Sequence, residues 1–181
     1  LVRAARFRPP ERTEPPDAEP RVDRDRAVEH LREMIRCRTI STPELRQEEE
    51  FERFRNLLPE FYPTLWKIAA VERVDTTGVL IRVPGREPGK PAVMLSHYDV
   101  VPAQEAAWEK PPFDGVLEDG VLWGRGTLDM KNQLCAMLEA AETLLESGFQ
   151  PRHDLYFALS GEEEIMGPSA PAMRDLFVER G

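Results

Sequence analysis

The chain has 181 residues, 41% of them hydrophobic, which is enough for one buried core of ordinary domain size. With 33 acidic and 24 basic residues its net charge is −9, so we expect no nucleic-acid partner and no attraction to an anionic membrane. No apolar run approaches the roughly 20 residues that span a bilayer, and the two cysteines lie in helix-like segments without the spacing of a disulfide framework or a zinc knot.

Residues 1–22 are expected to form an extended arm without a core of its own, because prolines stand among charged residues at Pro9, Pro10, Pro15, Pro16 and Pro20. Residues 23–181 are expected to form one main domain. The basic residues near the start fit the flank of an export signal or membrane anchor equally well as a simple chain boundary. The compartment therefore stays open between cytoplasmic and exported or anchored.

Apolar residues at helical spacing predict two amphipathic helices, one with Val28, Leu31, Met34 and Ile35 and one with Phe51, Phe54, Leu57 and Leu58. The second begins with the acidic turn 48–50, which suits a helix N-terminus. Ser41, Thr42 and Pro43 indicate a loop between the two helices.

Short apolar runs at 78–85 and 91–97 predict two neighbouring strands, and 154–160 predicts a third. A helix that begins near Lys131 and stops at Gly148 lies between the last two runs. Strand, helix and strand in this order predict a βαβ unit, whose functional groups gather beyond the carboxyl ends of its strands. The expected fold class is therefore α/β.

The segment SHYDVVP places His97 at the end of a strand, with Asp99 two positions later. In metal sites a carboxylate often accepts the proton of one imidazole nitrogen and leaves the other nitrogen aimed at the metal. His97 is then a ligand that Asp99 orients. On its own, the segment also fits a surface histidine beside an acid.

Two further segments carry carboxylates at comparable places. In DGVLWGRGTLDMK, a strand over 121–123 leads through two glycines to Asp129 at the start of a helix, where an aspartate either binds a cation or caps the helix. In SGEEEIMG, Glu162, Glu163 and Glu164 follow an apolar strand, where three like charges repel one another unless a cation neutralises them. Alone, such a run also fits a solvated loop.

The three segments together supply one imidazole and several carboxylates, which we expect at the same edge of one sheet. A donor set of nitrogen and oxygen without thiolate suits Zn²⁺, with Co²⁺ or Mn²⁺ as substitutes, and argues against an iron–sulfur or copper centre.

With these segments in place, the run from His97 to Asn132 and the GEEEIMG segment resemble the M20 metallopeptidases, most closely the branch of carboxypeptidase S and the N-acyl-amino-acid hydrolases. The resemblance covers roughly residues 24–181. It implies a three-layer zinc-peptidase sheet with flanking helices, of which this chain is the N-terminal part. A lid and dimerisation domain and a C-terminal part, with further metal ligands, would lie beyond Gly181, and the lid would form a homodimer.

The resemblance also implies a role for each site residue. His97 would bind one zinc, Glu164 would bind the other, and Asp129 would bridge both, while Asp99 orients His97. Glu163 would be the general base. The family has aspartate where Glu162 stands, so a register shifted by one residue, with Glu162 and Glu163 in these roles, is the alternative. Met166 replaces a usual glycine, and the Asp129–Met130 peptide is expected to be cis.

The implied activity is a two-zinc hydrolase that cleaves the amide bond of a peptide or N-acyl amino acid and releases an amino acid with a free carboxylate, as a carboxypeptidase does. The nearest alternative is an aminoacylase or N-fatty-acyl-amino-acid hydrolase. An alternative of another class is a non-catalytic descendant that keeps the fold as a binding module.

Overall fold

The computed structural model describes residues 21–43 and 47–181. The predicted arm, with all five of its prolines, falls on residues 1–20 and so lies outside the described residues apart from its last two positions.

Both predicted N-terminal helices are present. Helix α2 (Arg24–Arg36) begins after Asp23, whose carboxylate accepts the backbone N–H of Arg26 at 3.1 Å as an N-cap. Helix α3 (Glu48–Phe61) buries Phe51, Phe54 and Leu58 along one face. A third helix, α4 (Pro63–Ile68), follows directly, and its six residues are too few for a periodic pattern to reveal it.

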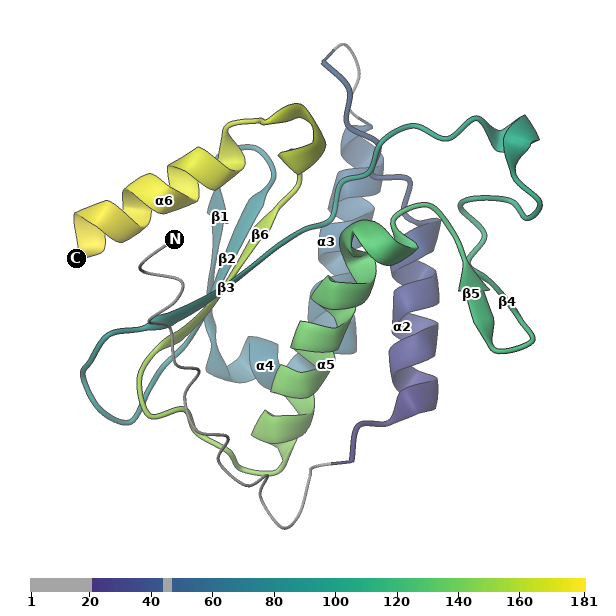
Figure 1. Cartoon of the computed structure of the whole chain (residues 1–181). Coiled ribbons are helices and arrows are strands. Elements are labelled where there is room, and N and C mark those ends of the chain that lie inside the picture. The colour runs from purple at the N-terminus through teal and green to yellow at the C-terminus, as the bar shows by residue number, and fades with distance from the viewer. Residues whose placement is uncertain (1–20, 44–46) are drawn as a thin grey trace, which may run out of the picture.

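The main sheet has four strands in the order β1 (Ala70–Val74), β2 (Gly78–Val83), β6 (Leu155–Ser160) and β3 (Ala92–His97), as Figure 1 shows. Strand β6 pairs antiparallel with β2 and parallel with β3. The prediction that 78–85 and 91–97 are neighbouring strands is therefore wrong. Strand β6 is the last of the four strands in the chain, but it lies between β2 and β3 in the sheet. Nearly all of its residues are buried, and both of its edges are paired.

The predicted βαβ unit is confirmed. Strand β3 leads to helix α5 (Asn132–Glu146), which ends just before Gly148 at φ 84°, and the chain returns as β6 parallel to β3. His97 is paired in register with Ser160, so the last residues of both strands lie side by side. The segments that follow them therefore leave the sheet at one edge.

Two apolar cores lie on opposite faces of the sheet. The larger joins the sheet to helices α2, α3, α4 and α5 and includes Met34, Phe54, Leu138 and Phe157. The smaller joins the other face to helix α6 (Ser169–Arg180) through Tyr156 and Met173. Helices thus cover both faces, which gives the three layers of the expected α/β class (Figure 1).

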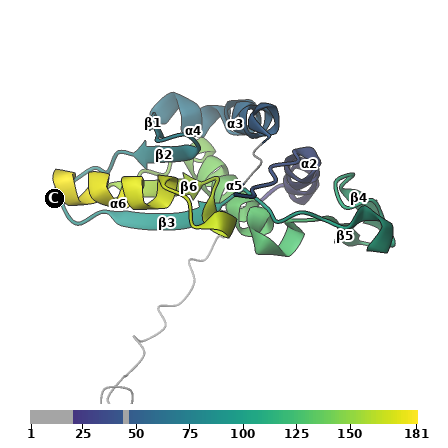
Figure 2. The ribbon, with the colours of Figure 1, turned by 90° about the horizontal axis from the view of Figure 1, so that it is seen from above.

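Strands β4 (Val116–Glu118) and β5 (Val121–Trp123) form a separate antiparallel hairpin. Figure 2 shows this hairpin beyond α2, at the end of the molecule opposite α6. The strand predicted at 121–123 exists, but it is not part of the main sheet. No helix among the described residues is long and apolar enough to cross a membrane.

Candidate metal site

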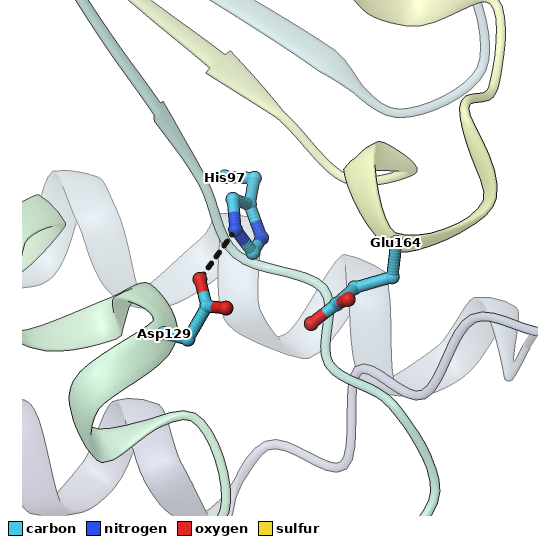
Figure 3. A group of neighbouring side chains, drawn as sticks. All are labelled: His97, Asp129 and Glu164. Carbon is cyan, nitrogen blue, oxygen red and sulfur yellow. Dashed lines mark hydrogen bonds and ion pairs between the residues drawn. The ribbon is translucent and has the colours of Figure 1, made fainter.

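Three of the predicted residues meet at the carboxyl ends of β3 and β6. His97 is the last residue of β3, Asp129 lies in the turn η2 (Thr127–Lys131) before α5, and Glu164 lies in the short turn η3 (Glu163–Ile165) after β6. One possible ligand atom from each of the three lies within 4.8 Å of the others. Figure 3 shows the three side chains converging from these separate segments.

The imidazole of His97 is buried and faces exposed carboxylates. Its Nε2 lies 3.0 Å from Oδ1 of Asp129 and 3.8 Å from Oε2 of Glu163. The His97 side chain is 6% exposed, whereas those of Asp129 and Glu163 are 77% and 59% exposed. The site is therefore buried behind the histidine and open to solvent in front of it.

Asp99 stands behind the histidine, as predicted, and is fully buried. Its Oδ1 lies 3.3 Å from Nδ1 of His97, and its own main-chain carbonyl oxygen lies 3.2 Å from the same nitrogen. The carboxylate also accepts the backbone N–H groups of Glu163 and Glu164, at 3.0 and 3.1 Å. The expected contact with His97 is present, and the contact with the glutamate turn is additional.

The side chains of the three consecutive glutamates point to different places. Glu162 is buried, and its carboxylate accepts the hydroxyl of Thr76 at 3.0 Å, whereas Glu163 and Glu164 face His97 and Asp129. This arrangement favours the register in which Glu163 and Glu164 serve the site. Met166 takes a left-handed conformation at φ 51°, which explains why glycine suits that position.

The route to Asp129 is as expected, since strand β5 leads through a glycine turn to this residue at the start of α5. The strand itself differs from the expectation, because it belongs to the β4–β5 hairpin and not to the main sheet. Gly126 opens the turn at φ 82°, and the Asp129–Met130 peptide is cis, as the resemblance implied. Lys131, which closes the turn, is fully buried. The sequence signal for this burial is that Lys131 precedes a run of uncharged residues, 132–138, at the start of an amphipathic helix.

The electrostatics of the site favour a cation. Burial lowers the pKa of His97, but the hydrogen bond and charge of Asp99, together with Asp129 and Glu163, outweigh burial and raise this pKa to about 9. Burial and then the charge of Asp129 raise the pKa of Glu164 above its usual value. Several carboxylates around one imidazole suit a divalent ion of the zinc type, so the residues present fit such a metal.

Comparison with known proteins supports the interpretation of this site as a metal site. The sequence pattern of peptidase family M20/M25/M40 matches residues 93–181. The chain is 36% identical over 131 residues to human N-fatty-acyl-amino acid synthase/hydrolase. The aligned residues make up 71% of this chain and 26% of that protein. It is 32% identical over 157 residues to carboxypeptidase S of Saccharomyces cerevisiae, covering 80% and 27% of the two chains.

The solved structure of human carnosine dipeptidase 1 has the same fold, with a TM-score of 0.64 at 23% identity, over 80% of this chain and 33% of that one. The imidazole and carboxylates beyond the parallel strands, together with relatives that are named as peptidases and hydrolases, support the class of metal-dependent hydrolase domains. Within that class, the chain belongs to the M20 peptidase family. It spans about a quarter of the length of the curated relatives it matches.

Proposed function

We propose that the whole protein is a two-metal hydrolase that cleaves the amide bond of a peptide or N-acyl amino acid and releases an amino acid with a free carboxylate. The observation that carries the proposal is the convergence of His97, Asp129 and Glu164 from three separate segments. Family membership supports it, because named relatives include carboxypeptidase S and an N-fatty-acyl-amino acid synthase/hydrolase.

His97, Asp129 and Glu164 would hold the metal, with Asp129 as the residue shared between two ions, and residues outside this chain would complete both coordination shells. Zinc suits this donor set best, and cobalt or manganese could replace it. When bound, such ions act as Lewis acids that polarise a carbonyl group and lower the pKa of water.

Glu163 is the proposed general base. Its carboxylate is largely exposed and lies 3.8 Å from His97 Nε2, on the open side of the site, where water and substrate have access. There it can take a proton from the attacking water and later deliver that proton to the leaving amine. Asp99 keeps Nδ1 of His97 occupied, so that Nε2 faces the metal side.

A second candidate is an N-fatty-acyl-amino-acid hydrolase. Its support is the 36% identity to the human N-fatty-acyl-amino acid synthase/hydrolase, together with the same identity to that protein in Bos taurus. The two candidates share the chemistry at the metal and differ in the group that is removed from the amino acid.

The test uses the full-length protein. Metal analysis of purified, metal-replete enzyme is expected to give two divalent ions per subunit, and a chelator should abolish hydrolysis until zinc is returned. Dipeptides, N-acetyl amino acids and N-oleoyl amino acids, compared by kcat/KM, decide between the two candidates. Protein that binds no metal would refute the proposal, whereas metal-bound protein that hydrolyses none of these would favour the non-catalytic alternative.

A further inference from the structure

Lys131 carries its side-chain amino group into the core, where no carboxylate of the described residues forms a hydrogen bond or ion pair with it. The residue has no exposed surface, and its Nζ donates hydrogen bonds to the main-chain oxygens of Met34 and Cys37, both at 2.8 Å. The same nitrogen lies 5.4 Å from the centre of the Phe54 ring. The contacts that hold this charge in the described part of the chain are thus main-chain carbonyls and an aromatic face.

Burial disfavours the charged form of this side chain and lowers the pKa of Lys131 to about 7, and an apolar side chain of the same length would fill the space at lower cost. One benefit is local, because Met34 and Cys37 lie at the C-terminal end of α2, where carbonyl groups lack partners within the helix and a positive charge is favourable. Capping alone would make Lys131 a structural residue of α2.

The position of Lys131 in the chain gives the contact a second effect. Its backbone N–H bonds the carbonyl of Gly126 at 2.9 Å and so closes the turn that carries Asp129. Inside that turn, Asp129 and Met130 leave the helical conformation, at φ −125° and −137°. The turn is thus not a continuation of α5 and needs its own support.

The aliphatic part of the Lys131 side chain supplies that support by packing against the turn. A methyl group built on Gly126 would lie 3.4 Å from Cδ of Lys131 and 2.6 Å from Cγ1 of Val100, so the turn packs directly on these two side chains. Asp129 itself is mostly exposed, and the contact that orients it is its 3.0 Å bond to His97. The place of its carboxylate therefore depends on where the turn is fixed.

We propose that Lys131 is a positioning residue for Asp129: its ammonium ties the turn to the end of α2 and so sets the place of the Asp129 carboxylate relative to His97. The inference rests on the proposed function, because it requires Asp129 to bind metal. This role differs from capping of α2 alone, because it requires metal binding to depend on the hydrogen bonds of Lys131 to Met34 and Cys37.

The experiment uses full-length protein with two variants of this residue. Lys131→Met removes the ammonium and keeps the length of the side chain, while Lys131→Arg keeps a charged donor. Leu138→Ala is the matched control, since Leu138 is buried in the same helix about two turns further on and does not touch the turn. Zinc affinity by chelator competition, the visible spectrum of the cobalt-substituted protein and the Tm of chelated protein are measured for each.

We expect Lys131→Met to lower zinc affinity by about 10- to 100-fold, as the loss of a partner that orients a ligand typically does, and to change the cobalt spectrum. Lys131→Arg should recover a large part of the affinity. Leu138→Ala should lower the Tm of the chelated protein and leave zinc affinity and the cobalt spectrum as in wild type.

Wild-type zinc affinity and an unchanged cobalt spectrum in Lys131→Met would overturn the inference and leave Lys131 as a cap of α2. A Lys131→Met protein that does not fold would overturn it as well, because the contact would then serve the fold. If wild-type protein binds no zinc at all, the proposed function itself fails, which separates the two results.

Discussion

The buried carboxylate of Asp99 accepts the backbone N–H of Glu164 across 65 positions of sequence, with Oδ2 and N 3.1 Å apart. Its other oxygen accepts the N–H of Glu163 at 3.0 Å and lies 3.3 Å from Nδ1 of His97. One side chain therefore joins the end of β3 to the turn after β6. Asp99 thus adds a side-chain link between the histidine and the glutamate pair to the pairing of β3 with β6.

Replacement of Asp99 should affect both sides of the site. Asp99→Ala leaves two part-buried N–H groups without their acceptor and releases His97, so metal affinity or activity should fall by about 10- to 100-fold. Asp99→Asn keeps the size and one acceptor and should be milder. The full burial of Asp99 also predicts a lower Tm for Asp99→Ala. Wild-type activity and zinc affinity in Asp99→Ala would remove Asp99 from the site.

The two neighbouring glutamates should respond differently to loss of charge. Glu163→Gln should abolish turnover while metal content stays near that of wild type, because Glu163 is proposed to touch water. Glu164→Gln should lower metal content as well, because Glu164 lies in the group of ligand atoms. Metal analysis and kcat of both full-length variants check this. Glu162→Gln is the control, since its carboxylate bonds Thr76, and the reverse pattern between Glu163 and Glu164 would exchange their roles.

Metal binding should depend on pH through His97. In metal-free protein the pKa of His97 is raised from 6.5 to about 9, so its proton stabilises the fold below pH 6.5, and this contribution is lost as the pH rises through 9. Zinc must displace that proton, so zinc affinity should increase with pH up to about 9. Titrations across this range, with proton release recorded, measure the effect. His153→Gln, at an exposed histidine outside the site, should leave the curve unchanged, and a flat curve in wild type would contradict the prediction.

The outer edge of β3 predicts how the 181-residue chain behaves when it is produced alone. Val93, Met94 and Leu95 are 41%, 42% and 65% exposed, and β3 is the edge strand of the sheet. An exposed apolar edge strand pairs readily with other chains. Leu95→Lys should therefore reduce self-association in light scattering. Phe149→Lys, which removes an apolar side chain from a loop, should reduce it less, and an equal effect would point to general hydrophobicity instead.

The local sequence pattern was sufficient to predict many of the helices and strands. The helical spacing around Met34 and Phe54, the stop at Gly148 and the strand–helix–strand order all predict elements that the structure contains. The same reasoning predicted His97, Asp129 and the run from Glu162 to Glu164 as candidates, because each stands where a strand ends or a helix begins. The choice of Glu164 within that run came from the family resemblance. Such features depend on residues close together in sequence.

Other features depend on pairing between distant segments, which one sequence does not reveal. The insertion of β6 between β2 and β3 follows from which strand buries best on both faces. The bond from Asp99 to the glutamate turn follows from the register that aligns His97 with Ser160. The separate direction of Glu162 depends on Thr76, at the far end of the β1–β2 turn.

The central place of β6 also sets an order of events during synthesis. Strands β1 and β2 can pair as soon as they emerge, but β3 has no neighbour in the sheet until residues 155–160 have been made. Until then its apolar side chains stay available to chaperones or to other nascent chains. His97 and Glu164 therefore come together only after the crossover through α5 has closed, and uptake of zinc by a growing chain would report that this closure is complete.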